Sequence, residues 1–296
     1  MRPRLEGVDW RARLCCPRCR GLLAAGEGEL RCASCPVRYE VNPAGVPILL
    51  IEEDRKRFAD ALARAAGMRA DYERRGKRGG RARWRRRLAP PLPVYLNPSR
   101  PKLELSRDGL HLWLGGGGHR TRAYLNLDLA PFAGVDVAGN ALRIPFCDSS
   151  CDTVACHALL EHVEEPWAVA GEIHRVLKPG GVAYVSAPFF HPWHGYPSDF
   201  FRFTREGLRR LFEKFEVVEE GVHAGPTTAL LTFLTDYAKL FFPVHARNPL
   251  ARAFNRTLVG AFGWMTAPLK YLDAWLLRKP EAYKLADTVY LVARKK

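Results

Sequence analysis

Short apolar runs alternate with amphipathic segments over the last two thirds of the chain. A well-marked helical segment, 166–177, begins with Pro166 at the favoured first position and ends at the Lys178-Pro-Gly-Gly turn. Seven runs rich in β-branched and aromatic residues predict strands at 110–114, 123–128, 135–138, 153–156, 182–187, 215–219 and 288–293. This alternation predicts an α/β fold with a doubly wound, seven-stranded, mostly parallel sheet.

Changes in composition divide the chain into three regions. Residues 12–54 are turn-rich and punctuated by cysteines, which indicates a small separate domain. Residues 55–102 hold the larger part of a predicted helix that begins at Glu52, then a basic run and a proline-rich linker. Residues 103–296 form the predicted α/β domain, with a helical insertion at 226–280.

The insertion shows two helical patterns. The segment 228–242 is largely apolar, and apolar residues recur at three- and four-residue spacing over 250–276, where Pro268 predicts a kink. Packing over the sheet or the substrate cleft is the leading interpretation. The alternative is an interfacial anchor whose basic residues, such as Arg252 and Lys270, meet anionic lipid.

The net charge of +15 is concentrated in one segment, 68–88. Such a run predicts a polyanionic partner, either nucleic acid or an anionic membrane surface, although a solvated linker would look the same. The first ten residues have no apolar stretch, and no apolar run is long enough to span a membrane. We therefore expect a cytoplasmic protein, or one peripheral at the inner membrane face.

Four of the eight cysteines form two CxxC pairs, Cys16 with Cys19 and Cys32 with Cys35. Two such pairs can close a tetrahedral shell of four thiolates, which favours a structural zinc ion because no position is left for substrate. A redox pair or coincidence are the alternatives. Cys15 is a spare thiol beside this set, and we expect no disulfides.

The apolar run at 110–114 leads into four consecutive glycines, and the next predicted strand ends at Asp128. A glycine turn after a first strand lets the backbone approach a nucleotide-type cofactor, and an acid after the second can accept ribose hydroxyls. Further along come IPFCDSSCDTVACHALLEH and EIHRVLKPGG.

In this order, these motifs resemble the class I S-adenosylmethionine-dependent methyltransferase family, in its small-molecule and RNA type (methyltransferase domain 11). The resemblance implies a Rossmann-like fold and S-adenosylmethionine as cofactor. It places cofactor contacts at Gly115, Gly117, Asp128, Asn140, Ala141 and His157. Trp113, His119 and Asn140 depart from the family pattern, and the segment between Gly115 and Asp128 is too short for the usual helix.

The loop after the fifth predicted strand, APFFHPWHGYPSDFFRFT, faces the transferred methyl group in this family. His191, His194 and Asp199 are candidates for a base, and Arg202 for an anion clamp. Asp199 and Arg202 could equally form a structural pair. The resemblance thus names His191, His194, Asp199 and Arg202 as catalytic candidates.

Residues 13–54 resemble the small zinc-ribbon domain that serves as activator subunit of tRNA and protein methyltransferases. This implies a scaffold or docking role. The chain is therefore predicted to methylate an O or N acceptor on a small molecule, a lipid-linked compound or RNA. The alternative is a non-catalytic scaffold that binds RNA or a protein through the zinc module and the basic run.

Overall fold

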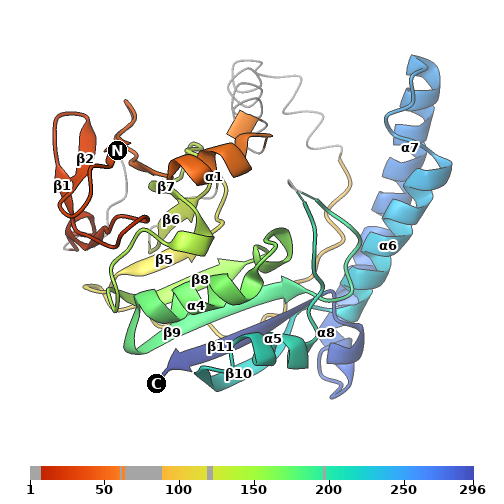
Figure 1. The fold of residues 1–296 in the computed structure, drawn as a ribbon. Helices are drawn as coiled ribbons and strands as arrows, with labels where there is room; N and C mark the ends of the chain where they lie inside the picture. The colour runs from red at the N-terminus through yellow and green to blue at the C-terminus, as the bar shows by residue number, and fades with distance from the viewer. Residues whose placement is uncertain (1–7, 61, 64–88, 119–122, 196–197) are drawn as a thin grey trace.

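The computed structural model describes residues 8–60, 62–63, 89–118, 123–195 and 198–296. The basic run at 68–88 and His119 lie outside the described residues. Two sheets organise the chain: a three-stranded antiparallel sheet near the N-terminus and a mixed eight-stranded sheet that forms the body (Figure 1).

The small sheet has the order β1-β2-β3, and the large sheet has the order β10-β11-β9-β8-β5-β6-β7-β4. Strands β4 to β9 pair in parallel, and β11 pairs antiparallel with both β9 and β10. The strands are β1 (Leu23–Ala25), β2 (Glu29–Cys32), β3 (Arg38–Glu40), β4 (Ile48–Leu49), β5 (His111–Leu114), β6 (Leu125–Asp128), β7 (Val137–Gly139), β8 (Cys151–His157), β9 (Leu177–Pro188), β10 (Phe215–Ala224) and β11 (Thr288–Lys295).

All seven predicted strands are present, and the sheet gains an eighth, β4, from the N-terminal region. The prediction of seven strands was wrong because β4 is only two residues long and has no readable periodicity. It pairs with β7, with Leu49 opposite Gly139. The N-terminal region therefore completes one edge of the large sheet.

The α-helices are α1 (Glu52–Arg57), α4 (Pro166–Val176), α5 (Arg205–Leu211), α6 (Pro226–Phe241), α7 (Pro249–Thr266) and α8 (Asp273–Leu276). Short 3-10 helices are η1 (Arg11–Arg13), η2 (Ala141–Arg143), η3 (Leu160–His162), η4 (Ala267–Leu272) and η5 (Ala282–Leu285). Thr204 caps the start of α5, since its Oγ1 accepts a hydrogen bond from Gly207 N at 2.9 Å.

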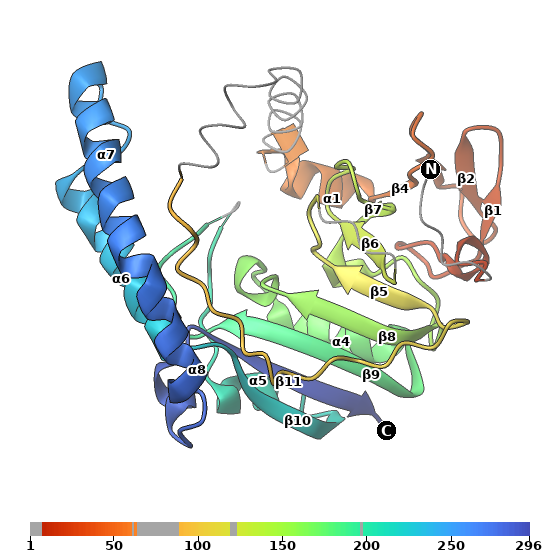
Figure 2. The same cartoon turned by 180° about the vertical axis from the view of Figure 1, so that it is seen from behind.

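The two faces of the sheet are covered differently. Helix α4 packs on one face through the buried residues Val169, Ile173 and Val176. On the other face an extended segment near Leu96 and Leu103 runs across β9, β11 and β10 (Figure 2). The doubly wound prediction, with helices on both faces, was therefore wrong for this part of the sheet.

Helices α6 and α7 form a hairpin that extends beyond the end of the sheet (Figures 1 and 2). Its base is fixed by Asp273, which is buried and accepts hydrogen bonds from Thr227 N at 2.8 Å and Thr228 N at 3.0 Å. At the predicted kink, α7 ends at Thr266 and the 3-10 helix η4 follows, with Pro268 in its first turn. The leading interpretation, packing over the sheet or cleft, was wrong because most of the stripe is exposed.

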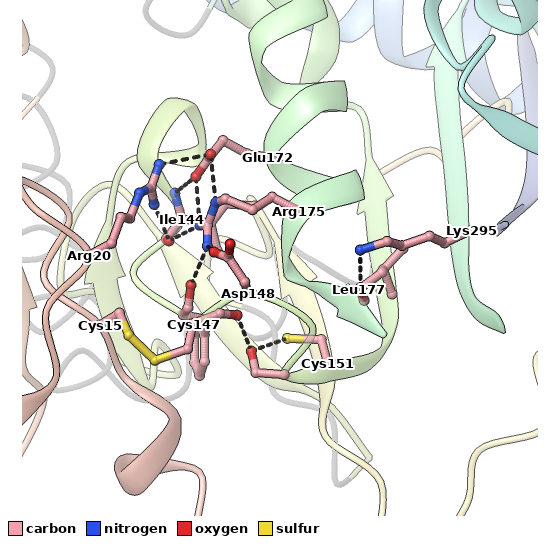
Figure 3. Close-up of polar contacts among 12 residues, drawn as sticks. Cys15, Arg20, Ile144, Cys147, Asp148, Cys151, Glu172, Arg175, Leu177 and Lys295 are labelled. Carbon is pink, nitrogen blue, oxygen red and sulfur yellow. Dashed lines mark hydrogen bonds and ion pairs between the residues drawn. A yellow bond between two sulfur atoms is a disulfide. The ribbon is translucent and has the colours of Figure 1, made fainter. Parts of the chain in front are cut away.

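The N-terminal region is held against the large domain by covalent and polar contacts (Figure 3). Cys15 forms a disulfide with Cys147, so the expectation of no disulfides was wrong. Arg20 donates to Glu172 Oε1 at 2.8 Å, and the same carboxylate accepts from Arg175. The residues joined by the disulfide and by the Arg20–Glu172 ion pair lie far apart in sequence, so no local pattern revealed these two contacts.

Candidate functional site

The parallel strands bring the candidate residues to one edge of the sheet. Strands β5 to β9 run in the same direction, so the segments that follow them meet at their carboxyl ends. Ligands of open α/β sheets bind in the crevice outside these ends. The segments in question begin at Gly115, Leu129, Asn140, Ala158 and Phe189.

The glycine turn after β5 has the conformation that a close backbone approach needs. Gly115 and Gly117 have φ values of +69° and +55°, which favour glycine. A Cβ at Gly116 would lie 2.4 Å from Asn126 Oδ1, and Asn126 Nδ2 donates to Gly117 O at 2.9 Å. The turn is thus fixed by β6, and Gly116 leaves no room for a side chain.

Asp128 ends β6 beside this turn. Its Oδ2 accepts a hydrogen bond from Gly117 N at 2.8 Å, and burial raises the pKa of the carboxyl above its usual range. The structure therefore places Gly115, Gly117 and Asp128 together, as the sequence predicted. A carboxylate beside a glycine turn at the end of the second strand suits the hydroxyls of a ribose.

Asn140 and Ala141 follow β7 and are both buried. Asn140 Oδ1 caps η2 by accepting from Leu142 N at 2.9 Å, and its Nδ2 donates to Asp54 Oδ1 at 2.9 Å. Asp54 is only 5% exposed, and its Oδ2 has no hydrogen-bond partner among the described parts of the chain. Sequence reasoning missed Asp54, because it lies on α1 and reaches Asn140 only through the tertiary fold.

His157 is the last residue of β8, and its ring lies against Trp113 and Tyr184 with centroid separations of 5.6 and 4.9 Å. Burial lowers the pKa of His157 to about 4, so the ring is neutral. The residue next to the glycine turn is instead Leu159, which a Cβ at Gly115 would meet at 3.0 Å. Contact between His157 and a cofactor stays a prediction.

The loop after β9 carries the predicted catalytic residues. All five N–H donors of the Arg202 guanidinium have partners: Asp199 and the backbone oxygens of His191, Pro192 and Phe201. The Arg202 guanidinium also holds the pKa of Asp199 well below its usual range. This pair shapes the loop, and no donor of Arg202 is left for an anionic substrate.

His191 and His194 come together with a ring-centroid separation of 4.7 Å. His191 Nδ1 lies 2.7 Å from Asp287 Oδ1, which orients the ring. His194 lies beside Glu161 and His162 of η3, the two residues of the sequence motif that precedes α4. Glu161 and His162 were not among the candidate site residues, so the grouping around Glu161 was not anticipated.

The four cysteines of the CxxC pairs gather as predicted. Their sulfur atoms all lie within 4.8 Å of one another, with Cys16 and Cys35 at 3.8 Å and Cys19 and Cys32 at 3.4 Å. Zinc–sulfur bonds of about 2.3 Å in a tetrahedron place the sulfurs roughly 3.8 Å apart. All four thiols are free of disulfides, so the donor set fits a zinc ion.

Comparison with known proteins shows that part of the chain is similar to methyltransferases. Residues 119–185 match the family model described as "Methyltransferase domain". An uncharacterized methyltransferase of Mycolicibacterium vanbaalenii is 30% identical over 40% of this chain and 42% of its own length. One of Mycobacterium leprae is 38% identical over 20% of this chain and 22% of its own. The chain thus spans less than half of these relatives.

Solved structures with similar folds include the [4+2]-cyclase SpnF, with 19% identity over 63% of this chain and 74% of that chain and a TM-score of 0.39. A complex of the Haloferax volcanii Trm112 methyltransferase activator with a second protein has 19% identity, covers 81% of this chain and 96% of that chain, and has a TM-score of 0.41.

Proposed function

We propose that the protein transfers a methyl group from S-adenosylmethionine to an O or N acceptor. The observation that carries this proposal is the glycine turn and Asp128 at the carboxyl edge of β5 and β6, within a chain that has a methyltransferase domain. Gly115, Gly117 and Asp128 would hold the ribose and methionine portions of the cofactor. The cofactor supplies an activated methyl group, so correct placement of the acceptor provides most of the rate.

Asp54 adds a carboxylate to the expected adenine site. The family resemblance implies an acid where this chain has Asn140, and Asp54 lies hydrogen-bonded to that asparagine with one oxygen unpartnered. We propose that Asp54 Oδ2 accepts a hydrogen bond from the adenine amino group. Asn140 would hold Asp54 in place through its hydrogen bond to Oδ1. The N-terminal region would then take part directly in cofactor binding.

The change Asp54→Asn should weaken binding of S-adenosylhomocysteine by about tenfold, because a hydrogen bond to a charged group contributes about 1.5 kcal/mol or more. Isothermal titration calorimetry measures this directly. Glu53→Gln alters an exposed neighbour on the same helix and should leave the affinity unchanged. Equal affinities of the Asp54 variant and the wild type would refute this role.

We propose that the four cysteines hold a structural zinc ion, supported by their sulfur separations and by the shortage of apolar core in the three-stranded sheet. The zinc would fix the region that carries β4 and α1. The module, residues 12–54, is thereby proposed to support the cofactor site and not to perform chemistry.

The exposed residues of the α6–α7 hairpin favour a methyl acceptor that lies at an anionic membrane surface. Leu240 is 76% exposed and Leu250 is 80% exposed, and the hairpin and its base also carry Arg252, Lys270 and Arg278. Large exposed apolar patches mark interaction sites, and basic residues beside them favour anionic lipid. None of the described helices is long and apolar enough to cross a membrane. We propose that the hairpin lies on the surface of the bilayer.

The triple change Leu240→Ser, Phe241→Ser and Leu250→Ser should reduce binding to phosphatidylglycerol-containing vesicles by at least about tenfold, because each buried side chain contributes roughly 1.5 kcal/mol or more. Co-sedimentation measures the bound fraction. Leu22→Ser, on the N-terminal module, is the control for an exposed leucine. If the triple variant binds vesicles as the wild type does, the hairpin is not the anchor.

A further inference from the structure

Glu161, His162 and His194 form a second cluster of metal-ligating side chains, far in sequence from the cysteines. Glu161 and His162 belong to η3, which follows β8, and His194 belongs to the loop that follows β9. One donor atom from each residue lies within 4.8 Å of the others. Phe200 N donates to Glu161 O at 2.7 Å and so fixes the two loops against each other.

The carboxylate of Glu161 is the unusual member of this cluster. Its residue is 0% exposed, and neither Oε1 nor Oε2 accepts a hydrogen bond from any residue that the structure describes. A buried carboxylate without hydrogen bonds is costly unless a cation compensates it. The nearest cation candidates are His194 Nε2 at 3.5 Å and His162 Nε2 at 3.8 Å, both measured to Glu161 Oε1.

The backbone determines how the two imidazoles present their nitrogens. His162 Nδ1 lies 2.7 Å from Ser198 O, and His194 Nδ1 lies 3.2 Å from Pro192 O. A carbonyl only accepts, so each Nδ1 carries a proton, and in the neutral ring Nε2 has a free electron pair. Both electron pairs then face the Glu161 carboxylate. In a metal-binding histidine, the ring nitrogen that does not bind the metal usually donates a hydrogen bond to a carboxylate, a backbone carbonyl or water.

We propose that Glu161, His162 and His194 bind a divalent first-row transition metal ion of the zinc type. Two imidazoles and one carboxylate form the ligand set of open, three-ligand metal centres, and this set suits zinc better than magnesium or calcium.

The position of this cluster suggests what the ion does. The three ligands lie on the loops after β8 and β9, and Leu159 of the same loop contacts the glycine turn. His194 is partly exposed, so coordination positions remain accessible to an oxygen atom of the methyl acceptor. This role in acceptor binding rests on the proposed methyl transfer, whereas the metal site itself does not.

Cobalt titration of the full chain tests the site. Protein whose cysteine cluster is first filled with zinc is titrated with Co²⁺, and visible absorption is recorded. The wild type should take up one further equivalent with weak d–d bands and without the intense sulfur-to-cobalt bands of thiolate ligation. Glu161→Gln and His194→Gln should each weaken this binding by about 100-fold or more, because loss of a direct ligand costs at least as much as loss of an outer-shell partner, which costs about 10–100-fold.

His245→Gln, an exposed histidine of the chain, is the matched control and should leave the Co²⁺ affinity unchanged. His162→Gln gives an independent third test if Glu161→Gln lowers the thermal midpoint. Binding of S-adenosylhomocysteine is measured on every variant, and retained binding separates failure of the metal site from failure of the methyltransferase proposal. No Co²⁺ uptake by the wild type at millimolar metal, or unchanged uptake in both Glu161→Gln and His194→Gln, overturns the proposal.

Discussion

Asp128→Asn is expected to reduce the affinity for S-adenosylhomocysteine by at least about 100-fold. The carboxylate would accept two ribose hydroxyls, and each hydrogen bond to a charged group contributes roughly 1.5–3 kcal/mol. The asparagine keeps an oxygen that can accept from Gly117 N, so the glycine turn is preserved while the charge is lost. Isothermal titration calorimetry at constant salt gives the two dissociation constants.

Asp152→Asn is the matched control for this experiment. Asp152 also accepts a backbone hydrogen bond, from Leu110 N at 2.8 Å, but it lies at the amino end of the parallel strands. Its variant should bind the ligand as the wild type does. Equal binding by the Asp128 variant would mean that the glycine turn does not hold the cofactor, and the methyltransferase proposal would fail.

The sequence predicted those parts of the fold that are determined by the pattern of residues within one short segment. Strands β5 to β11 each contain an apolar run bounded by turn residues, and α4 begins at Pro166 as its pattern requires. The cysteine cluster could be predicted in the same way, because the two-residue spacing of each CxxC pair lets both of its sulfur atoms face one metal ion. Gly115, Gly117 and Asp128 follow from the order of strand, turn and strand.

The parts that could not be predicted depend on long-range packing. A two-residue strand such as β4 has no periodicity, and the link from Cys15 to Cys147 has no local signature. The apolar stripe of α7 looked like a packed face, since a sequence pattern does not reveal whether a partner covers it. The Glu161 cluster combines two loops, so only the tertiary structure shows that His194 reaches the motif after β8.

Arg202 illustrates a different limit. The residue type and its place in the loop suggested a clamp for an anionic substrate, with a structural pair as the equal alternative. The structure assigns every donor to Asp199 or to a carbonyl, and these bonds fix the loop that carries His191 and His194. We therefore regard Arg202 and Asp199 as positioning residues.

Removal of the zinc proposed for the cysteine cluster is the second change with a large expected effect. The double variant Cys19→Ser and Cys32→Ser should contain one zinc ion fewer per chain than the wild type. Structural zinc contributes about 10 kcal/mol or more to the folding of small modules, and the three strands of the small sheet bury only the side chains of Leu30 and Tyr39. Limited proteolysis should then cut within residues 12–54 at protease concentrations that leave the wild type intact.

The loss should extend to the cofactor site, because β4 lies within the module and α1 begins in it, and α1 carries Asp54 against Asn140. We expect the affinity of the double variant for S-adenosylhomocysteine to fall at least as far as that of Asp54→Asn. Cys15→Ser is the control: this neighbour of Cys16 is paired with Cys147, so its variant should keep the full zinc content. Unchanged zinc content in the double variant, or rapid reaction of all four thiols with a thiol reagent in the untreated protein, would exclude zinc from the cluster.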